Sequence, residues 1–274
     1  MGKLKAQIKE LFYKFGFSAL LDKLLFRIAF FKNKKRNFLY RNSNSNITFP
    51  PDYCLYETYQ LNYQLYIEDG NLSAKEIIEW TTKYISTTQI NILEWGCGVS
   101  RTTRHIHKYI NQHSQIFACD INKEMIEWNE KYINNVSFST ISYKPPTNYF
   151  NSQFNLIYCI SVFTHIDALV QDKWIKEIHR ILNTNGIFLF TTHGSKYLNK
   201  LLPTEQKELF ANGVYTKSYY KKGHRLMSTY NLSNKFKLII EKYFDLLEFY
   251  DGGKHPEKLG GQDLWIVRKS NNCL

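Results

Sequence analysis

One short segment constrains the fold of this chain more than any other: residues 89–101, with the sequence QINILEWGCGVSR. Its β-favouring apolar residues predict a buried parallel strand, which closes on Glu94 and a turn that contains Gly96 and Gly98. Glycines lack a Cβ atom, so the backbone can turn sharply and a ligand can come close, while the first amides of the next helix face the crevice. The segment therefore predicts an open α/β sheet that binds a nucleotide-like ligand at this turn.

A second acidic residue supports the same binding site. Residues 115–120, QIFACD, form another β-like run that ends at Asp120, and an acid about 20 residues after such a turn can bind ribose hydroxyls. A dinucleotide-binding loop has a third glycine where this chain has Arg101, which disfavours a nicotinamide cofactor. S-adenosylmethionine carries no phosphate and has a positive sulfonium, which suits the acidic Glu94.

At these residues the chain resembles the class I S-adenosylmethionine-dependent methyltransferases, whose first motif reads acid-x-G-x-G. The sequence EWGCG fits this motif, with Glu94 in place of the commoner aspartate and Ser100 where a third glycine often stands. The resemblance implies S-adenosyl-L-methionine as the cofactor. It implies cofactor contacts from Glu94, Gly96, Cys97, Gly98, Arg101, Asp120, Ile121 and Ser161.

The resemblance extends over about residues 70 to 269. Residues 153–166, QFNLIYCISVFTHI, resemble the family's fourth strand and the loop after it, and residues 174–194 resemble its next helix, turn and fifth strand. The closing GGQDLWIVRK, residues 260–269, resembles the last strand of a subgroup associated with bacterial surface-glycan synthesis. An ordered series of motifs is far more specific than one glycine pair.

The order of expected elements gives an α/β fold: a doubly wound, mostly parallel seven-stranded sheet with an antiparallel last strand, plus a basic helical N-terminal extension. A capping box at residues 73–76 predicts a helix that begins at Ser73, and another helix is expected over residues 101–110. Residues 213–232 are expected to be an irregular basic-aromatic insert. We expect two units: an extension and linker, residues 1–46, and the methyltransferase domain, residues 47–274.

The N-terminal extension carries most of the net charge. Nine of the twelve net positive charges lie in residues 1–41, where apolar residues recur at helical spacing and predict one or two basic amphipathic helices. Charged residues interrupt every apolar stretch, so no conventional spanning helix or signal peptide is expected. Two interpretations remain: a helical cap packed on the domain, or a tether to an anionic inner membrane face. The apolar positions are Leu4, Ile8, Leu11, Phe12, Phe15, Leu21, Leu24, Leu25 and Ile28.

The cysteine spacing indicates a reducing compartment, and therefore a cytoplasmic protein. The five cysteines show no CxxC pair and no regular framework, so neither structural disulfides nor a zinc site is expected. We interpret Cys97 as a small residue that fills the cofactor turn and not as a nucleophile. Five tyrosines between residues 53 and 66, at near-helical steps, favour a packing stripe over a sugar-stacking or lid surface.

Two histidines are candidates for the general base. His165 and His193 follow the fourth and fifth expected strands, whose carboxyl ends lie nearest a ligand in this fold. A histidine with a pKa near neutrality can remove the proton of an alcohol acceptor, although His165 also fits a helix-capping role. The other histidines are expected in loops, on the surface or in packing, and no cluster has the spacing of metal ligands.

The sequence therefore predicts an S-adenosylmethionine-dependent methyltransferase, and the subgroup resemblance implies O-methylation of a sugar or other small polar acceptor. Two alternatives remain open. An RNA methyltransferase would explain the net charge, but most basic residues lie in residues 1–41 and no RNA-binding module is visible. The other is a non-catalytic cofactor-binding or membrane-tethered partner protein, which the motif residues Glu94, Gly96, Gly98 and Asp120 disfavour.

Overall fold

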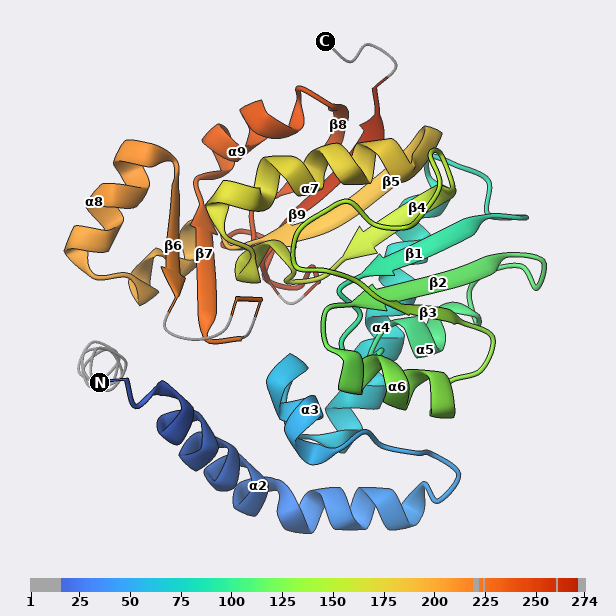
Figure 1. The fold of residues 1–274 in the computed structure, drawn as a ribbon. Coiled ribbons are helices and arrows are strands. Elements are labelled where there is room, and N and C mark those ends of the chain that lie inside the picture. The colour runs from blue at the N-terminus through green and yellow to red at the C-terminus, as the bar shows by residue number, and fades with distance from the viewer. Residues whose placement is uncertain (1–15, 219–221, 224, 260, 271–274) are drawn as a thin grey trace.

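A seven-stranded sheet forms the centre of the molecule (Figure 1). The computed structural model describes residues 16–218, 222–223, 225–259 and 261–270. The first five strands in the sheet are parallel, and the sixth, β9, is antiparallel to both of its neighbours. The predicted sheet is therefore confirmed. Its order is β3 (Ser137–Thr140), β2 (Gln115–Asp120), β1 (Asn91–Trp95), β4 (Phe154–Cys159), β5 (Leu182–Thr192), β9 (Asp263–Lys269) and β8 (Phe244–Tyr250).

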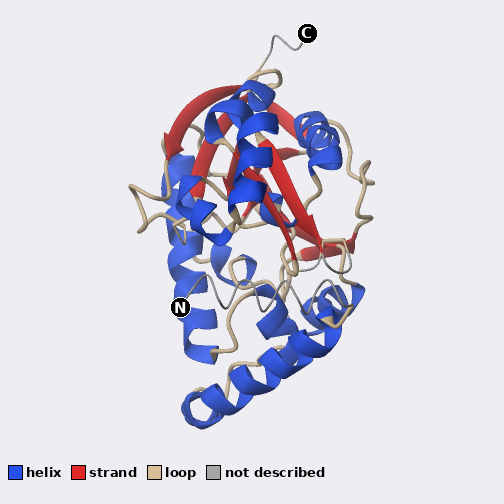
Figure 2. Ribbon diagram, turned by 90° about the vertical axis from the view of Figure 1, so that its left-hand side faces the viewer, coloured by secondary structure: helices blue, strands red, loops and turns tan. Residues whose placement is uncertain are grey.

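Helices cover both faces of the sheet, as Figure 2 shows from the side. The central strands are apolar and buried on both faces, which is the pattern of parallel strands in α/β folds. On one face, Trp174 and Ile178 of α7 (Ala168–Ile181) pack against Phe188 of β5. On the other face, Ala74 and Ile77 of α4 (Tyr63–Thr82) pack against the side chains of β1 and β4.

The remaining helices and a hairpin surround this core. A two-stranded antiparallel hairpin, β6 (Val214–Ser218) and β7 (Met227–Asn231), stands beside the sheet. The other α-helices are α2 (Ser18–Ser43), α3 (Asp52–Thr58), α5 (Thr103–Ile106), α6 (Lys123–Tyr132), α8 (Pro203–Asn212) and α9 (Ser233–Ile240). Two 3₁₀ helices, η1 (Phe163–His165) and η2 (Ser195–Lys200), follow β4 and β5.

Three local predictions differ from the structure. Helix α4 begins ten residues before Ser73, because the Asn62 side chain caps it by accepting a hydrogen bond from the Leu65 amide at 3.3 Å. The helix expected over residues 101–110 is the single turn α5, with turns on both sides. The insert expected over residues 213–232 is the hairpin β6–β7, whose second strand buries Met227, Thr229, Tyr230 and Asn231.

The N-terminal helix α2 is part of the packed structure. Its residues Leu25, Phe26 and Phe30 pack against a cluster from α3 and α4 that includes Tyr56 and Tyr63. The predicted tyrosine stripe therefore lies in this layer, where its hydroxyls are hydrogen-bonded: Tyr66 donates to the Val99 carbonyl at 2.6 Å. The division into residues 1–46 and 47–274 stays a prediction, and Leu4, Ile8, Leu11, Phe12 and Phe15 lie outside the described residues.

Within the described residues, no helix is both long enough and apolar enough to cross a membrane.

Candidate active site

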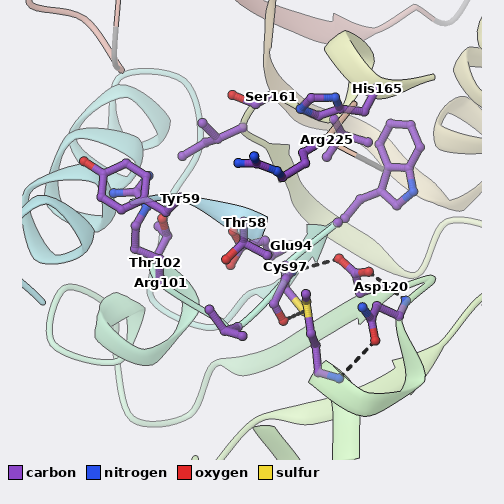
Figure 3. A pocket seen from close by; sticks show the side chains of 18 of the residues that line it. Thr58, Tyr59, Glu94, Cys97, Arg101, Thr102, Asp120, Ser161, His165 and Arg225 are labelled. Atoms are coloured by element: carbon purple, nitrogen blue, oxygen red, sulfur yellow. Dashed lines mark hydrogen bonds between the residues drawn. The ribbon is translucent and has the colours of Figure 1, made fainter. Parts of the chain in front are cut away.

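A cavity of about 580 Å³ opens at the carboxyl ends of β1, β2 and β4. This is where open α/β sheets bind ligands, because the strand order reverses there and loops diverge from the sheet. In the close view of Figure 3, Ser161, His165 and Arg225 lie toward one side of the cavity, and Cys97 and Asp120 lie toward the other. Of the predicted site residues, all except His193 line this cavity.

The turn after β1 is held in shape by its glycines and by β2. Gly96 and Gly98 have φ of 77° and 52°, in the left-handed region that favours glycine. The amides of Gly96 and Cys97 donate to the Cys119 carbonyl at 2.8 and 3.0 Å, while the Gly98 carbonyl accepts from the buried Asn129 side chain at 2.8 Å. The backbone of the turn is therefore fixed before any ligand binds.

Asp120 connects the end of β2 to this turn. One carboxylate oxygen accepts from the Gly98 amide at 2.8 Å and the other from the Asn122 amide at 2.9 Å. Burial raises the pKa of the carboxyl, and the amides oppose this effect. Each oxygen keeps a second lone pair, so the carboxylate can still accept hydrogen bonds from hydroxyls in the cavity. Ile121, the next residue, adds an apolar wall.

Glu94 lies beneath the turn and is held by neighbouring donors. One of its oxygens accepts from the Thr103 amide and the Tyr158 hydroxyl, both at 3.0 Å, and from the Thr103 hydroxyl. Burial raises the pKa of the Glu94 carboxyl to about 8, although these donors and Arg101 act to lower it. In the free protein Glu94 is therefore mostly protonated at pH 7, and a cation beside it would favour ionisation.

Arg101 joins the cofactor turn to α3 and α4. Its guanidinium lies 4.6 Å from the centre of the Tyr59 ring and donates to the Ser73 hydroxyl at 3.1 Å. Gly70 lets α4 approach the Arg101 backbone, because a Cβ atom there would lie 2.1 Å from the Arg101 carbonyl oxygen. Ser73, expected to cap a helix, thus fixes the orientation of Arg101 instead.

Cys97 has the properties of a packing residue. Its side chain is buried, and burial raises the pKa of the thiol well above its usual range, so the reactive thiolate is not formed near neutral pH. The structure thus gives the same interpretation as the sequence.

A polar network that the sequence did not reveal holds Ser161 at the end of β4. Ser161 has a φ of 64°, a conformation that is uncommon for residues other than glycine. Its amide donates to the Thr191 hydroxyl at 2.8 Å, and its own hydroxyl accepts from the Gln262 amide at 2.8 Å. Gln262 also accepts from Thr191 at 2.6 Å, so three residues from the loop after β4, from β5 and from the segment before β9 form one hydrogen-bonded ring. The ring fixes the backbone that faces the cavity.

His165 reaches the cavity from η1 with a defined tautomer. Its Nδ1 lies 2.6 Å from the Met227 carbonyl oxygen. A carbonyl only accepts, so Nδ1 carries the hydrogen of the neutral ring and Nε2 keeps its lone pair. Burial lowers the pKa of His165, and nearby Arg225 acts in the same direction, so the ring is neutral at pH 7. The neutral ring can therefore accept a proton at Nε2.

His193 is not brought to the cavity. Its ring lies between Tyr197 and Tyr230, with ring centres 4.4 and 5.1 Å away, and its Nδ1 donates to the Thr229 carbonyl at 3.2 Å. Burial lowers its pKa to about 3. The hairpin β6–β7 supplies Thr229 and Tyr230, and it is this unpredicted element that encloses His193. His224 lies outside the described residues.

Arg225 is the cavity residue that sequence reasoning missed most clearly. It donates to the buried Asp22 carboxylate of α2 at 2.7 and 3.1 Å, and its guanidinium lies 3.8 Å from the centre of the Tyr56 ring. Helix α2 therefore reaches the cavity wall through an ion pair between residues 203 positions apart. No local sequence pattern indicates a contact over this distance.

Among the residues that the structure describes, no group of three or more His, Cys, Asp or Glu side chains is arranged to hold a metal ion.

Comparison with known proteins identifies the domain. Residues 92–186, from β1 into β5, match a family model described as "Methyltransferase domain". These residues are therefore similar to a methyltransferase domain over about a third of the chain. No curated protein matches the sequence.

Solved structures share the fold. An S-adenosylmethionine-dependent methyltransferase from Methanosarcina mazei aligns with a TM-score of 0.52 at 16% identity, over 69% of this chain and 95% of that one. A putative methyltransferase from Listeria monocytogenes aligns at 0.54 and 11%, over 73% and 99%. A 1,6-didemethyltoxoflavin-N1-methyltransferase from Burkholderia thailandensis, with S-adenosylhomocysteine bound, aligns at 0.51 and 12%, over 74% and 80%. At these identities the structures show the class I methyltransferase fold.

The cavity of the methyltransferase domain fits its cofactor, S-adenosylmethionine. A volume of about 580 Å³ lies within the range of pockets that enclose ligands of this size. Asp120 offers acceptors for ribose hydroxyls, the turn at Gly96 to Gly98 allows close approach, and Glu94 offers a carboxyl to a cationic group. The domain match, the fold and this fit together support a transferase with S-adenosylmethionine as its cofactor.

Proposed function

We propose that this methyltransferase transfers a methyl group to a hydroxyl oxygen of a sugar or another small polar acceptor, with His165 as the general base. The observation that carries this proposal is the tautomer of His165: its Nδ1–H is engaged with the Met227 carbonyl, and Nε2 is available to accept a proton. The ring lies at the cavity edge and is neutral near pH 7. A hydroxyl acceptor needs such a base, because it is a poor nucleophile until its proton is removed.

The mechanism assigns separate roles to the two sides of the cavity. When bound, S-adenosylmethionine supplies an electrophilic methyl group on a positively charged sulfur. Asp120 and the Gly96–Gly98 turn would hold and orient the cofactor, and Glu94 would offer a carboxyl to its positive charge. His165 accepts the proton of the acceptor hydroxyl at Nε2, while the Met227 carbonyl stabilises the imidazolium that forms. The enclosing walls exclude water and align the reacting atoms.

The charges of the cavity support a neutral polyhydroxyl acceptor over a nucleic acid. A nucleic-acid site is strongly basic, because it must neutralise phosphates. This cavity mixes both signs, and its carboxylates can accept hydrogen bonds from sugar hydroxyls. The acidic residues are Glu57, Asp69, Glu76, Glu94, Asp120 and Glu257, and the basic ones are Arg101, Lys222 and Arg225. Residues 260–269 resemble a subgroup associated with bacterial surface-glycan synthesis, which also supports a sugar acceptor. Polysaccharide biosynthesis is therefore the proposed context.

The base is tested by replacing His165. We expect His165→Ala to lower turnover about 10² to 10⁴-fold, with cofactor affinity nearly unchanged, because only the proton acceptor is lost. Added imidazole should restore part of the activity by occupying the space of the missing ring. The control is His193→Gln, which alters a histidine outside the cavity; its loss of activity should not exceed its loss of folded protein. Equal activity of His165→Ala and the wild type on a hydroxyl acceptor would remove the base from the mechanism.

The cofactor site is tested separately. Asp120→Ala removes the carboxylate proposed to accept ribose hydroxyls, and charge-assisted hydrogen bonds of this kind contribute roughly 1.5 to 3 kcal/mol each. Calorimetry with S-adenosylhomocysteine should therefore show binding weakened by at least about tenfold. Unchanged affinity would exclude Asp120 from the cofactor site.

We also propose a cytoplasmic location with peripheral attachment to the inner membrane face. The support is the charge of α2, which contains seven Lys and Arg residues and one acidic residue, Asp22. Asp22 is paired with Arg225, so it does not offset the charge of the helix. Adsorption to lipid vesicles tests this location.

A further inference from the structure

Helix α2 has two faces of different composition, and only one of them is covered by the rest of the protein. The inward face contains Asp22, Phe26, Phe30, Asn33 and Asn37, at steps of three and four residues, and it packs on the rest of the protein. Asp22 is 3% exposed and its carboxylate is paired with Arg225. This face therefore positions the helix and is not available to a partner.

The outward face carries a stripe of exposed apolar side chains. The stripe residues follow one another at steps of three, four and seven positions, so they lie on one side of the helix, opposite Asp22 and Asn33. Soluble proteins rarely expose such a contiguous apolar surface unless it binds something. The stripe consists of Leu20 (63% exposed), Leu24 (53%), Ile28 (56%), Phe31 (70%) and Phe38 (62%).

Basic residues flank this stripe on both sides. Lys23, Arg27 and Lys34 lie along one edge of it, Lys32 lies along the other, and Lys35 lies within it. No acidic residue of α2 faces outward, since its single acid is Asp22. An apolar stripe between rows of cations matches a surface with anionic groups above an apolar interior, which is an anionic lipid membrane.

The shape of the molecule permits a flat contact. Helix α2 has 26 residues, which corresponds to about 39 Å at 1.5 Å per residue, and it lies along one edge of the molecule in Figure 1. In Figure 2 the helix again lies at the lower edge of the molecule, outside the layers around the sheet. The outward side therefore faces away from the layers around the sheet, although the helix bends near its middle in Figure 1.

We propose that the outward face of α2 is a docking surface for an anionic lipid membrane. The stripe enters the boundary between headgroups and acyl chains, and the flanking Lys and Arg side chains contact anionic headgroups. This proposal rests on the peripheral attachment proposed above, for which it names the surface, and it does not rest on the proposed methyl transfer. It does have a consequence for the cavity: the inward side of the same helix contacts Arg225 at the cavity wall, so about one helix diameter, 10 to 12 Å, separates this wall residue from the docked surface.

The test uses the full chain with two kinds of vesicle, neutral phosphatidylcholine and phosphatidylcholine mixed with phosphatidylglycerol. Co-sedimentation should rise with phosphatidylglycerol and fall with added salt, because the charge contribution is screened. The double variant Leu24→Glu with Phe31→Glu should lower the partition coefficient at least about tenfold, because two stripe side chains no longer enter the lipid.

A matched control separates this site from a general effect of charge. Phe210→Glu with Leu238→Glu changes net charge by the same amount at two side chains of similar exposure, 55% and 60%, on α8 and α9. This variant should bind vesicles like the wild type. A third variant, Lys34→Gln with Lys35→Gln, keeps all five apolar stripe residues and should weaken binding about fivefold per charge. Melting curves of all variants report whether the fold is retained.

Three results would overturn the proposal. Equal sedimentation with neutral and anionic vesicles would exclude anionic lipid. Equal loss of binding in the α2 variant and the α8–α9 control would exclude this face. A wild-type dimer without lipid that Leu24→Glu with Phe31→Glu converts to a monomer would show that a second copy occupies the stripe; sedimentation equilibrium measures this.

Discussion

The pH dependence of stability tests whether burial raises the pKa of the Glu94 carboxyl. Its carboxyl pKa is about 8 in the folded protein, against 4.5 for an ordinary glutamate. Between these values the folded state holds a proton that the unfolded state has released, so stability must fall as pH rises. The folded protein holds about 0.9 proton more than the unfolded chain at pH 7 and about 0.5 more at pH 8, which corresponds to a loss of about 1 kcal/mol over this interval.

The perturbation is Glu94→Gln, which keeps the size and an acceptor oxygen for Thr103 and Tyr158 but cannot ionise. The assay is thermal unfolding without cofactor at several pH values between 7 and 8.5. We expect the melting temperature of the wild type to fall by roughly 2 to 4 °C more than that of the variant for each pH unit. The buried histidines His105 and His193 do not contribute to the change in stability between pH 7 and 8.5, because burial lowers their pKa values to about 3.

Parallel melting curves for the two proteins would refute this reasoning. They would mean that Glu94 is already ionised at pH 7, so that Thr103, Tyr158 and Arg101 outweigh the cost of burial. A wild type that gains stability relative to the variant as pH rises would contradict even the direction of the shift.

Other positions test packing, the polar network and acid stability. Gly70→Ala should destabilise the fold by about 1 to 3 kcal/mol in denaturant unfolding, because its Cβ would meet the Arg101 carbonyl at 2.1 Å; an unchanged midpoint would show that α4 can shift. Gln262→Ala should weaken S-adenosylhomocysteine binding by about tenfold in calorimetry, because the Ser161 hydroxyl and Thr191 both lose a hydrogen-bond partner. Wild-type affinity of this variant would show that the network does not contribute to the cofactor site. His105→Leu should stabilise the protein by about 1 to 3 kcal/mol, because both ring nitrogens are buried without partners. Burial lowers the pKa of His105 from 6.5 to about 3, so the gain should increase as pH falls from 6.5 toward 3, and a constant gain would contradict this.

The sheet and the cofactor turn could be predicted because their information is local. A buried strand, two glycines and an acid at Asp120 lie within one βαβ unit, and each has a direct backbone or side-chain reason. The structure places Glu94, Gly96, Gly98 and Asp120 around one cavity in this way. Local chemistry therefore sufficed for the region where neighbours in sequence are neighbours in space.

The acceptor side could not be predicted to the same degree. His165 and His193 both follow strands, and sequence alone gave no reason to choose between them. The difference is made by β7, which supplies the Met227 carbonyl to His165 and the Tyr230 ring to His193. The turn-forming and charged residues of 213–232 indicated an irregular segment, so the hairpin was not predicted. Its contacts with His165 and His193 could therefore not be predicted either.

The same reason explains the missed start of α4. The capping box at Ser73 is a genuine local signal, but the helix had already begun at Tyr63, where Asn62 caps it. The Ser73 hydroxyl instead accepts a hydrogen bond from Arg101, a residue 28 positions away. Local signals of helix termini compete, and tertiary packing decides which one is used.

The ion pair between Asp22 and Arg225 also sets an order of events during synthesis. A ribosome adds about 5 to 20 residues per second, so about 10 to 40 s pass between the emergence of Asp22 and that of its partner 203 residues later. During that time the nascent α2 lacks the arginine that neutralises its carboxylate and cannot complete the cavity wall. A chain stalled before residue 225 would therefore present this helix without the contact that joins it to the cavity wall.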